Sequence, residues 1–249
     1  MKVVFLGVGE AFDEHYPTNC HLIVSNTKLL LDCGFSAPQQ VWKFNPDQSY
    51  LDAVFISHCH ADHHFGLPSL LNRMEAEGRT KKLTIICQNG SKELLKEVIK
   101  LGYPGLLPKL EFKLNFIEVV PGQTVHLSEM KLSFATTAHS LPNLAIRVEA
   151  KSKVVCYSGD GQFNHSTRAV YSKADLLIHE AYLYSVAKQG HGTMVGVVKL
   201  AEQEHVKCVA LTHIDRFLRA KGLEEIKEKL ATSKVMVLIP EPLEQLEIK

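Results

Sequence analysis

Short apolar segments recur along the whole chain, and most of them have the length of a β-strand. Many are rich in Val, Ile and Leu and are bounded by Gly, Pro, Asn, Asp or Ser, which is typical of strands separated by turns. Asn26-Thr27 separates two of the segments and predicts a hairpin. The predicted strands cover residues 2–6, 21–24, 28–32, 52–56, 82–87, 131–135, 144–149, 153–157, 175–179, 207–211 and 235–239.

Helical spacing of apolar residues is found between clusters of these segments. Ser91 is placed to cap a helix that Gly102 would end, and Thr193 is placed to cap another. Two more helices are predicted at about 68–76 and 223–230. Strands in clusters with helices between them indicate an α/β (layered α+β) fold in which helices cover sheets.

Composition narrows the functional classes. Lys and Arg number 28 against 27 Asp and Glu, so the net charge is only +1 and no basic run is present to hold nucleic acid by its phosphates. No apolar run approaches the ~18 residues of a membrane-spanning helix. The 6 Cys are scattered, which argues against a disulfide framework and indicates a reducing cytoplasm. We expect a single domain over residues 1–249.

Histidines gather after one apolar strand. The run His58-Cys59-His60-Ala61-Asp62-His63 places three imidazoles and one carboxylate within six residues, and these are ligands that zinc favours. A solvated polar loop is the alternative interpretation, but it would not follow a buried strand so closely. His64 is expected to pack against the loop rather than bind metal.

Three further candidate ligands follow strands elsewhere in the chain. They are His139, Asp160 and His213, each at the C-terminal end of a predicted strand. A lone His in this position is more often structural, but together they complete a set large enough for two ions that share one carboxylate. The predicted ligands are His58, His60, Asp62, His63, His139, Asp160 and His213.

This pattern resembles the metallo-β-lactamase superfamily. Its His-x-His-x-Asp-His signature matches residues 58–63, and its later motifs match His139, Gly159-Asp160 and Thr212-His213 in the same order. The resemblance implies a four-layer αββα sandwich of two mixed β-sheets with the metals at one edge. It also implies one ion held by His58, His60 and His139, a second held by Asp62, His63 and His213, and Asp160 as the bridge.

Further motifs resemble the ribonuclease Z branch of that superfamily. Among them are Leu31-Asp32-Cys33-Gly34, His179-Glu180-Ala181 and Gly190-His191-Gly192-Thr193. That branch usually carries an arm that grips tRNA, inserted between the third His and the bridging Asp. Here Asp160 follows His139 by 21 positions, which is enough for two strands and a turn but not for an arm.

The predicted activity is that of a dinuclear zinc-dependent hydrolase, with Mn²⁺ or Fe as alternatives to the two Zn²⁺ ions. The ions would share a water of lowered pKa, and the resulting hydroxide would attack a phosphorus or carbonyl centre. Asp62 is expected to bind metal and orient the nucleophile. His191 is expected to donate a proton to the leaving oxygen, with Glu180 orienting it. His179 is expected to support the site from outside the ligand set.

The favoured substrate is a small or cyclic phosphodiester, because the chain is nearly neutral and has no room for the arm. A tRNA 3′-processing endonuclease that acts on RNA, in the manner of ribonuclease Z, is one alternative. Hydrolysis of a lactone, thioester or β-lactam is another, and a non-catalytic metal-binding module is the least favoured. The oligomeric state stays open, and the resembled branch suggests a homodimer. No membrane partner is expected.

Overall fold

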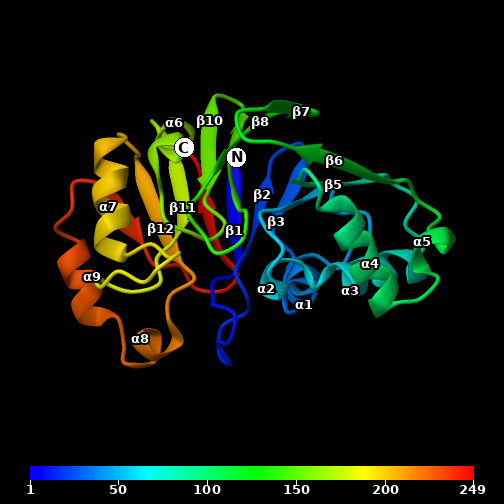
Figure 1. Cartoon of the computed structure of the whole chain (residues 1–249), viewed down its shortest axis with the longest axis horizontal. Coiled ribbons are helices and arrows are strands. Elements are labelled where there is room, and N and C mark those ends of the chain that lie inside the picture. The colour runs from blue at the N-terminus through cyan, green and yellow to red at the C-terminus, as the bar shows by residue number, and fades with distance from the viewer.

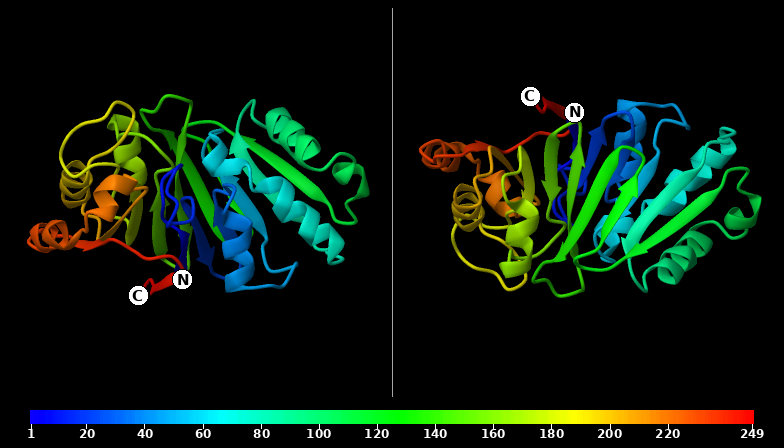
Figure 2. Two further views of the ribbon diagram at one scale, coloured as in Figure 1. Left: turned by 90° about the horizontal axis from the view of Figure 1, so that it is seen from below. Right: turned by 90° about the horizontal axis from the view of Figure 1, so that it is seen from above.

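Two seven-stranded β-sheets pack face to face, and helices cover their outer surfaces (Figures 1 and 2). The structure is a computed structural model that describes residues 1–249. It has the four-layer αββα arrangement of two mixed sheets that the sequence predicts. The strands are β1 (Lys2–Gly7), β2 (Cys20–Val24), β3 (Lys28–Leu31), β4 (Ala53–Ile56), β5 (Leu83–Gln88), β6 (Leu114–Val119), β7 (Thr124–Leu127), β8 (Met130–Thr136), β9 (Leu144–Ala150), β10 (Lys153–Tyr157), β11 (Leu176–Glu180), β12 (Cys208–Thr212), β13 (Met236–Leu238) and β14 (Glu244–Glu247).

The first sheet has the order β14-β1-β2-β3-β4-β5-β6, and the second has the order β13-β12-β11-β10-β9-β8-β7. In the first sheet, β3 to β6 run parallel; in the second, β10 to β13 do. The helices are α1 (Ala37–Phe44), α2 (Ala61–His64), α3 (Leu67–Ala76), α4 (Lys92–Gly102), α5 (Leu106–Lys109), α6 (His165–Tyr171), α7 (Met194–Gln203), α8 (Arg216–Ala220) and α9 (Glu224–Leu230). None of these helices is long and apolar enough to cross a membrane.

The inner strands of both sheets, such as β4, β11 and β12, are buried on both faces, which explains why their sequences are continuous apolar runs. In β4, Phe55 points into the core between the sheets, whereas Val54 and Ile56 point into the core beneath the helices of the first sheet. Phe55 stacks on Phe134 of the second sheet, with ring centroids 5.8 Å apart. Alternate side chains of one strand therefore serve two cores, and the sheet becomes an internal layer.

The predicted strands are all present, and the three that sequence reasoning missed, β6, β7 and β14, lie at sheet edges. Thr193 caps α7 by accepting a hydrogen bond from the N–H of Gly196. Ser91 precedes α4 as predicted, but its side chain makes no capping hydrogen bond. Gly102 is the last helical residue rather than a left-handed stop; a Cβ there would lie 2.5 Å from that of Pro68, so glycine lets α4 approach α3.

The two sheets are also joined by a hydrogen-bonded contact between the turns that precede β3 and β8. The Glu129 carboxylate accepts from the backbone N–H of Thr27 at 2.9 Å and from its hydroxyl at 2.6 Å. Burial alone would raise the pKa of Glu129, but these hydrogen bonds outweigh it and lower the pKa to about 2. Glu129 thus links the second sheet to the Asn26-Thr27 hairpin of the first.

Glu129→Gln is expected to lower the free energy of unfolding at neutral pH by about 1 kcal/mol, a value discounted for solvent screening. The folded pKa of Glu129 lies below the ~4.3 of an unfolded glutamate. The contribution is therefore complete above about pH 4.3 and is lost as the pH falls toward 2. Urea unfolding between pH 3 and 6 should show the variant and wild type converging as the pH falls. Glu228→Gln, an exposed glutamate without an ion pair, is the control; a pH-independent difference for Glu129→Gln would contradict the assignment.

Candidate metal centre

Each candidate ligand lies just beyond the C-terminal end of a strand, at one edge of the sandwich. The 58–63 run follows β4, His139 follows β8, Asp160 follows β10 and His213 follows β12. Strands β8, β10 and β12 point the same way, so their C-terminal ends meet at this edge. The interval between His139 and Asp160 contains the antiparallel hairpin of β9 and β10 and no arm, as predicted.

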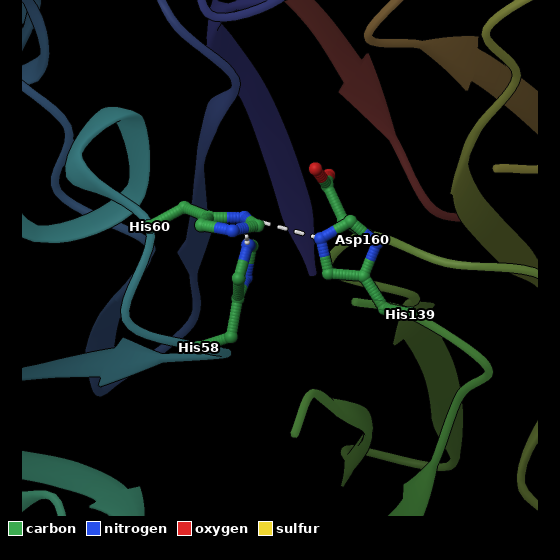
Figure 3. Close-up of side chains that lie close together, drawn as sticks. All are labelled: His58, His60, His139 and Asp160. Atoms are coloured by element: carbon green, nitrogen blue, oxygen red, sulfur yellow. Dashed lines mark hydrogen bonds between the residues drawn. The ribbon is translucent and has the colours of Figure 1, made fainter. Parts of the chain in front are cut away.

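The first donor group consists of His58, His60, His139 and Asp160, whose ligand atoms all lie within 4.8 Å of one another. Figure 3 shows the rings of His58, His60 and His139 pointing toward one another, with Asp160 beside them. Nδ1 of His60 lies 2.9 Å from Nε2 of His58 and 3.1 Å from Nε2 of His139. Burial and the neighbouring His63 lower the pKa of His58 well below its ordinary value. A neutral imidazole of this kind is a metal ligand.

The second donor group consists of Asp62, His63, Asp160 and His213. Nε2 of His63 lies 3.2 Å from Oδ2 of Asp62 and 3.5 Å from Oδ1 of Asp160. Nε2 of His213 lies 3.4 Å from Oδ2 of Asp160. Burial would lower the pKa of His213, but the carboxylates of Asp160 and Asp62 outweigh it and raise the pKa to about 9. Asp160 belongs to both groups, which is the position of a bridging ligand.

Helix α2 determines how the 58–63 run divides between the groups. His58 and His60 lie in the turn after β4, whereas Asp62 and His63 lie on the single helical turn of α2. The sequence analysis predicts this division of the run but not the helix. His64 turns away from both donor groups, with its Nδ1 2.8 Å from the carbonyl oxygen of His60.

His191 and Glu180 meet beside the second donor group. Nδ1 of His191 lies 3.6 Å from Oε1 of Glu180, which is beyond hydrogen-bond length. The fully buried Glu180 carboxylate is held instead by the N–H groups of Gly161 at 3.1 Å and Gly192 at 2.7 Å. The ring of His191 packs on that of Tyr182, with centroids 4.8 Å apart. The structure therefore brings the predicted pair close together without a hydrogen bond between them.

His179 lies farther from the centre than sequence reasoning suggests. Its ring packs against Phe163 and Tyr171, and its Nδ1 lies 2.7 Å from the carbonyl oxygen of Glu180. It makes no hydrogen bond to a candidate ligand. Its contacts are those of a buried side chain that supports the strand end carrying Glu180.

A pocket of about 380 Å³ opens over both donor groups. Its lining includes six of the polar residues described above and four with apolar or aliphatic surface: His60, Asp62, His139, Asp160, His191 and His213, and Phe12, Phe35, Tyr182 and Lys188. The Lys188 ammonium lies 3.9 Å from the centre of the Tyr182 ring, a cation–π contact. The pocket size is at the small end of the range for ligand sites.

The donor set fits divalent cations. Nε2 of His63 and Oδ1 of Asp160 are buried without a hydrogen-bond partner, which is costly for polar atoms. Both atoms face the other members of the second donor group. Imidazole nitrogens combined with carboxylate oxygens are the ligands expected for zinc and similar ions. The residues therefore form a site for divalent metal.

The fold and this centre define a metallo-hydrolase of the metallo-β-lactamase fold. The solved metallo-β-lactamase fold protein YhfI from Bacillus subtilis matches with a TM-score of 0.83 and 25% identity, over 98% of each chain. The short form of human tRNase Z shares the fold with a TM-score of 0.83 and 22% identity, over 100% of each chain. The predicted superfamily is confirmed.

Residues 1–234 match the family described as Anti-Pycsar protein Apyc1, and the chain belongs to this family. Curated relatives named ribonuclease Z also match. The protein from Methanosarcina mazei is 25% identical over 100% of this chain and 98% of the relative. The protein from Methanothermobacter thermautotrophicus is 27% identical over 92% and 90% respectively. The chain is thus a ribonuclease Z-like, metal-dependent hydrolase.

Proposed function

We propose that the chain is a dinuclear zinc-dependent phosphodiesterase that hydrolyses a small or cyclic phosphodiester. The observation that carries the proposal is the presence of Asp160 in both donor groups. A bound pair of cations supplies a Lewis acid for the phosphoryl oxygens and a water acidic enough to act as a nucleophile near neutral pH. His58, His60 and His139 would hold one ion, Asp62, His63 and His213 the other, and Asp160 would contact both.

Two further steps need groups that accept or donate a proton: activation of the attacking water and departure of the leaving oxygen. Asp62 lines the pocket, where its carboxylate can accept a hydrogen bond from the attacking water. His191 lies in the same pocket, partly exposed, and can donate a proton to the departing oxygen. Glu180 holds Nδ1 of His191 in place by charge, and the ring of Tyr182 limits its rotation.

The preference for a small substrate rests on the pocket and on the β9–β10 hairpin. A volume of about 380 Å³ suits a ligand of modest size. Phe12 and Phe35 supply apolar wall surface, and Lys188 supplies a positive charge beside it. The hairpin occupies the interval between His139 and Asp160, so the substrate has to be held by the pocket itself.

Precursor tRNA is the second candidate substrate. The observation in its favour is the match to relatives named ribonuclease Z over nearly the full length of both chains. Cleavage of a 3′ trailer with steep salt dependence would support this function, because phosphate contacts release counterions. A salt-insensitive reaction on small diesters would argue against it.

The test is elemental analysis of the purified chain combined with a hydrolysis panel. We expect about two zinc ions per chain and turnover of bis(p-nitrophenyl) phosphate and of a cyclic nucleotide. A lactone, a β-lactam and a precursor tRNA complete the panel. Metal-free protein, or rates that are highest on the lactone or β-lactam, would overturn the proposal.

A further inference from the structure

Asp32 is a fully buried carboxylate just after β3, to which the sequence alone assigned no role. Its φ of 61° lies in the left-handed region, which Asp tolerates better than most residues. Oδ1 accepts from the N–H of Ser57 at 2.7 Å. Oδ2 accepts from the Ser57 hydroxyl at 2.8 Å, from Nδ1 of His63 at 2.7 Å and from the Tyr157 hydroxyl at 2.6 Å. A carboxylate with this many donors is a rigid acceptor.

This acceptor sets the tautomers of two candidate ligands. Because Nδ1 of His63 faces the Asp32 carboxylate, it carries a hydrogen, and Nε2 is the nitrogen that faces the second donor group and would bind a metal there. The Ser57 hydroxyl gives its hydrogen to Asp32, so it accepts from Nδ1 of His58 at 3.0 Å. Nε2 of His58 then faces the first donor group as an acceptor. One buried carboxylate therefore orients an imidazole in each group.

Tyr157, the last residue of β10 in the second sheet, is hydrogen-bonded to Asp32. Its fully buried ring packs edge-to-face on His21, with centroids 5.3 Å apart. Nδ2 of Asn19 donates to the phenol oxygen at 3.2 Å, so the phenol hydrogen is directed to Asp32. The same strand leads to Asp160 three residues later. Strand β10 thus places the shared carboxylate and also supports a ligand on the opposite sheet.

We propose that Tyr157 is a positioning residue for the metal centre. Through its hydrogen bond to Asp32 it holds His63 in the ligating tautomer and orientation, so that metal affinity depends on the docking of the second sheet onto the first. The inference rests on the proposed function only in that the centre binds metal. Groups that orient a ligating histidine from outside typically change metal affinity about 10–100-fold.

Tyr157→Phe removes only the phenol oxygen and keeps the buried ring in place. We expect zinc at one of the two sites to bind about tenfold more weakly, measured by competition with a chromophoric chelator. Tyr171→Phe is the matched control, because Tyr171 is also fully buried but its hydroxyl has no hydrogen-bond partner. The control should bind zinc as the wild type does. Thermal melting of the metal-free proteins separates a loss of stability from a loss of affinity.

Histidine-selective ¹⁵N spectra of the zinc-loaded protein supply a second readout. The wild type should show His63 with hydrogen on Nδ1 and zinc on Nε2, and Tyr157→Phe should show a fraction of His63 with hydrogen on Nε2 instead. Unchanged zinc affinity and an unchanged His63 tautomer in Tyr157→Phe would overturn the inference and leave the proposed function standing. An equal loss of affinity in Tyr171→Phe would also overturn it. A wild type that binds no zinc would overturn both the proposed function and the inference.

Discussion

Replacing Asp160 by alanine is expected to remove most of the bound metal and to lower turnover about 10³-fold or more. Its two carboxylate oxygens face different imidazoles: Oδ1 lies 3.5 Å from Nε2 of His63, and Oδ2 lies 3.4 Å from Nε2 of His213. Burial would favour the neutral acid, but these imidazoles lower the pKa of Asp160 well below its ordinary value. The substitution therefore removes one anionic ligand from both donor groups at once.

The measurement is zinc content per chain together with turnover of bis(p-nitrophenyl) phosphate. Asp175→Ala is the control, since Asp175 is a partly buried aspartate directly before β11 of the second sheet, paired with Lys207 at 2.7 Å and not part of the pocket lining. The control should keep its zinc content and its rate. Retention of both zinc ions by Asp160→Ala, with turnover within about tenfold of the wild type, would show that Asp160 does not bridge them.

The grouping of the candidate ligands can be anticipated from the sequence because each one directly follows a strand that is buried on both faces. The sequences of such strands are continuous apolar runs, so a His or Asp at the end of one stands out in the sequence. Once β8, β10 and β12 are recognised as strands of one sheet, His139, Asp160 and His213 have to lie at the same edge. The division of the 58–63 run between the two groups was also predicted, but the helix that produces it was not, because the single turn of α2 is too short to show helical periodicity.

Two of the three missed strands, β7 and β14, have a physical explanation. Strand β14 reads Glu-Gln-Leu-Glu and is mostly exposed, and β7 has only four residues, with exposed and half-buried positions alternating. Both lie at sheet edges, where backbone pairing and not side-chain burial holds the strand. An apolar pattern therefore does not reveal them.

The hydrogen bonds that hold the candidate metal ligands in place also could not be predicted from the sequence. Asp32 and Tyr157 are 125 residues apart, and their hydrogen bond forms only because the two sheets pack face to face. Each residue taken alone looks like an ordinary strand-end aspartate or a core tyrosine. The one local feature of the sequence that marks this position is the motif Asp32-Cys33-Gly34 directly after a predicted strand. In the structure, the backbone turns at Asp32 with a positive φ.

His191→Ala is expected to slow hydrolysis of a cyclic nucleotide by about 10²–10⁴-fold while zinc content stays at the wild-type level. A ribose oxygen leaves as a strongly basic alkoxide unless a proton reaches it, and His191 is the partly exposed imidazole of the pocket outside the predicted ligand set. With bis(p-nitrophenyl) phosphate the leaving group is weakly basic and needs no proton. The same variant should then lose less than about tenfold in rate.

The contrast between the two substrates distinguishes proton donation from a structural role of His191. If the variant merely disturbed the pocket, for instance through the Tyr182 ring packed against it, both substrates would slow by the same factor. His165→Ala, an exposed histidine at the start of α6, should change neither rate. Glu180→Gln should reproduce the dependence on the leaving group more weakly, because it removes the charge that faces Nδ1 but leaves the imidazole in place. Equal losses on both substrates would assign the proton donation to another group and leave His191 as part of the pocket wall.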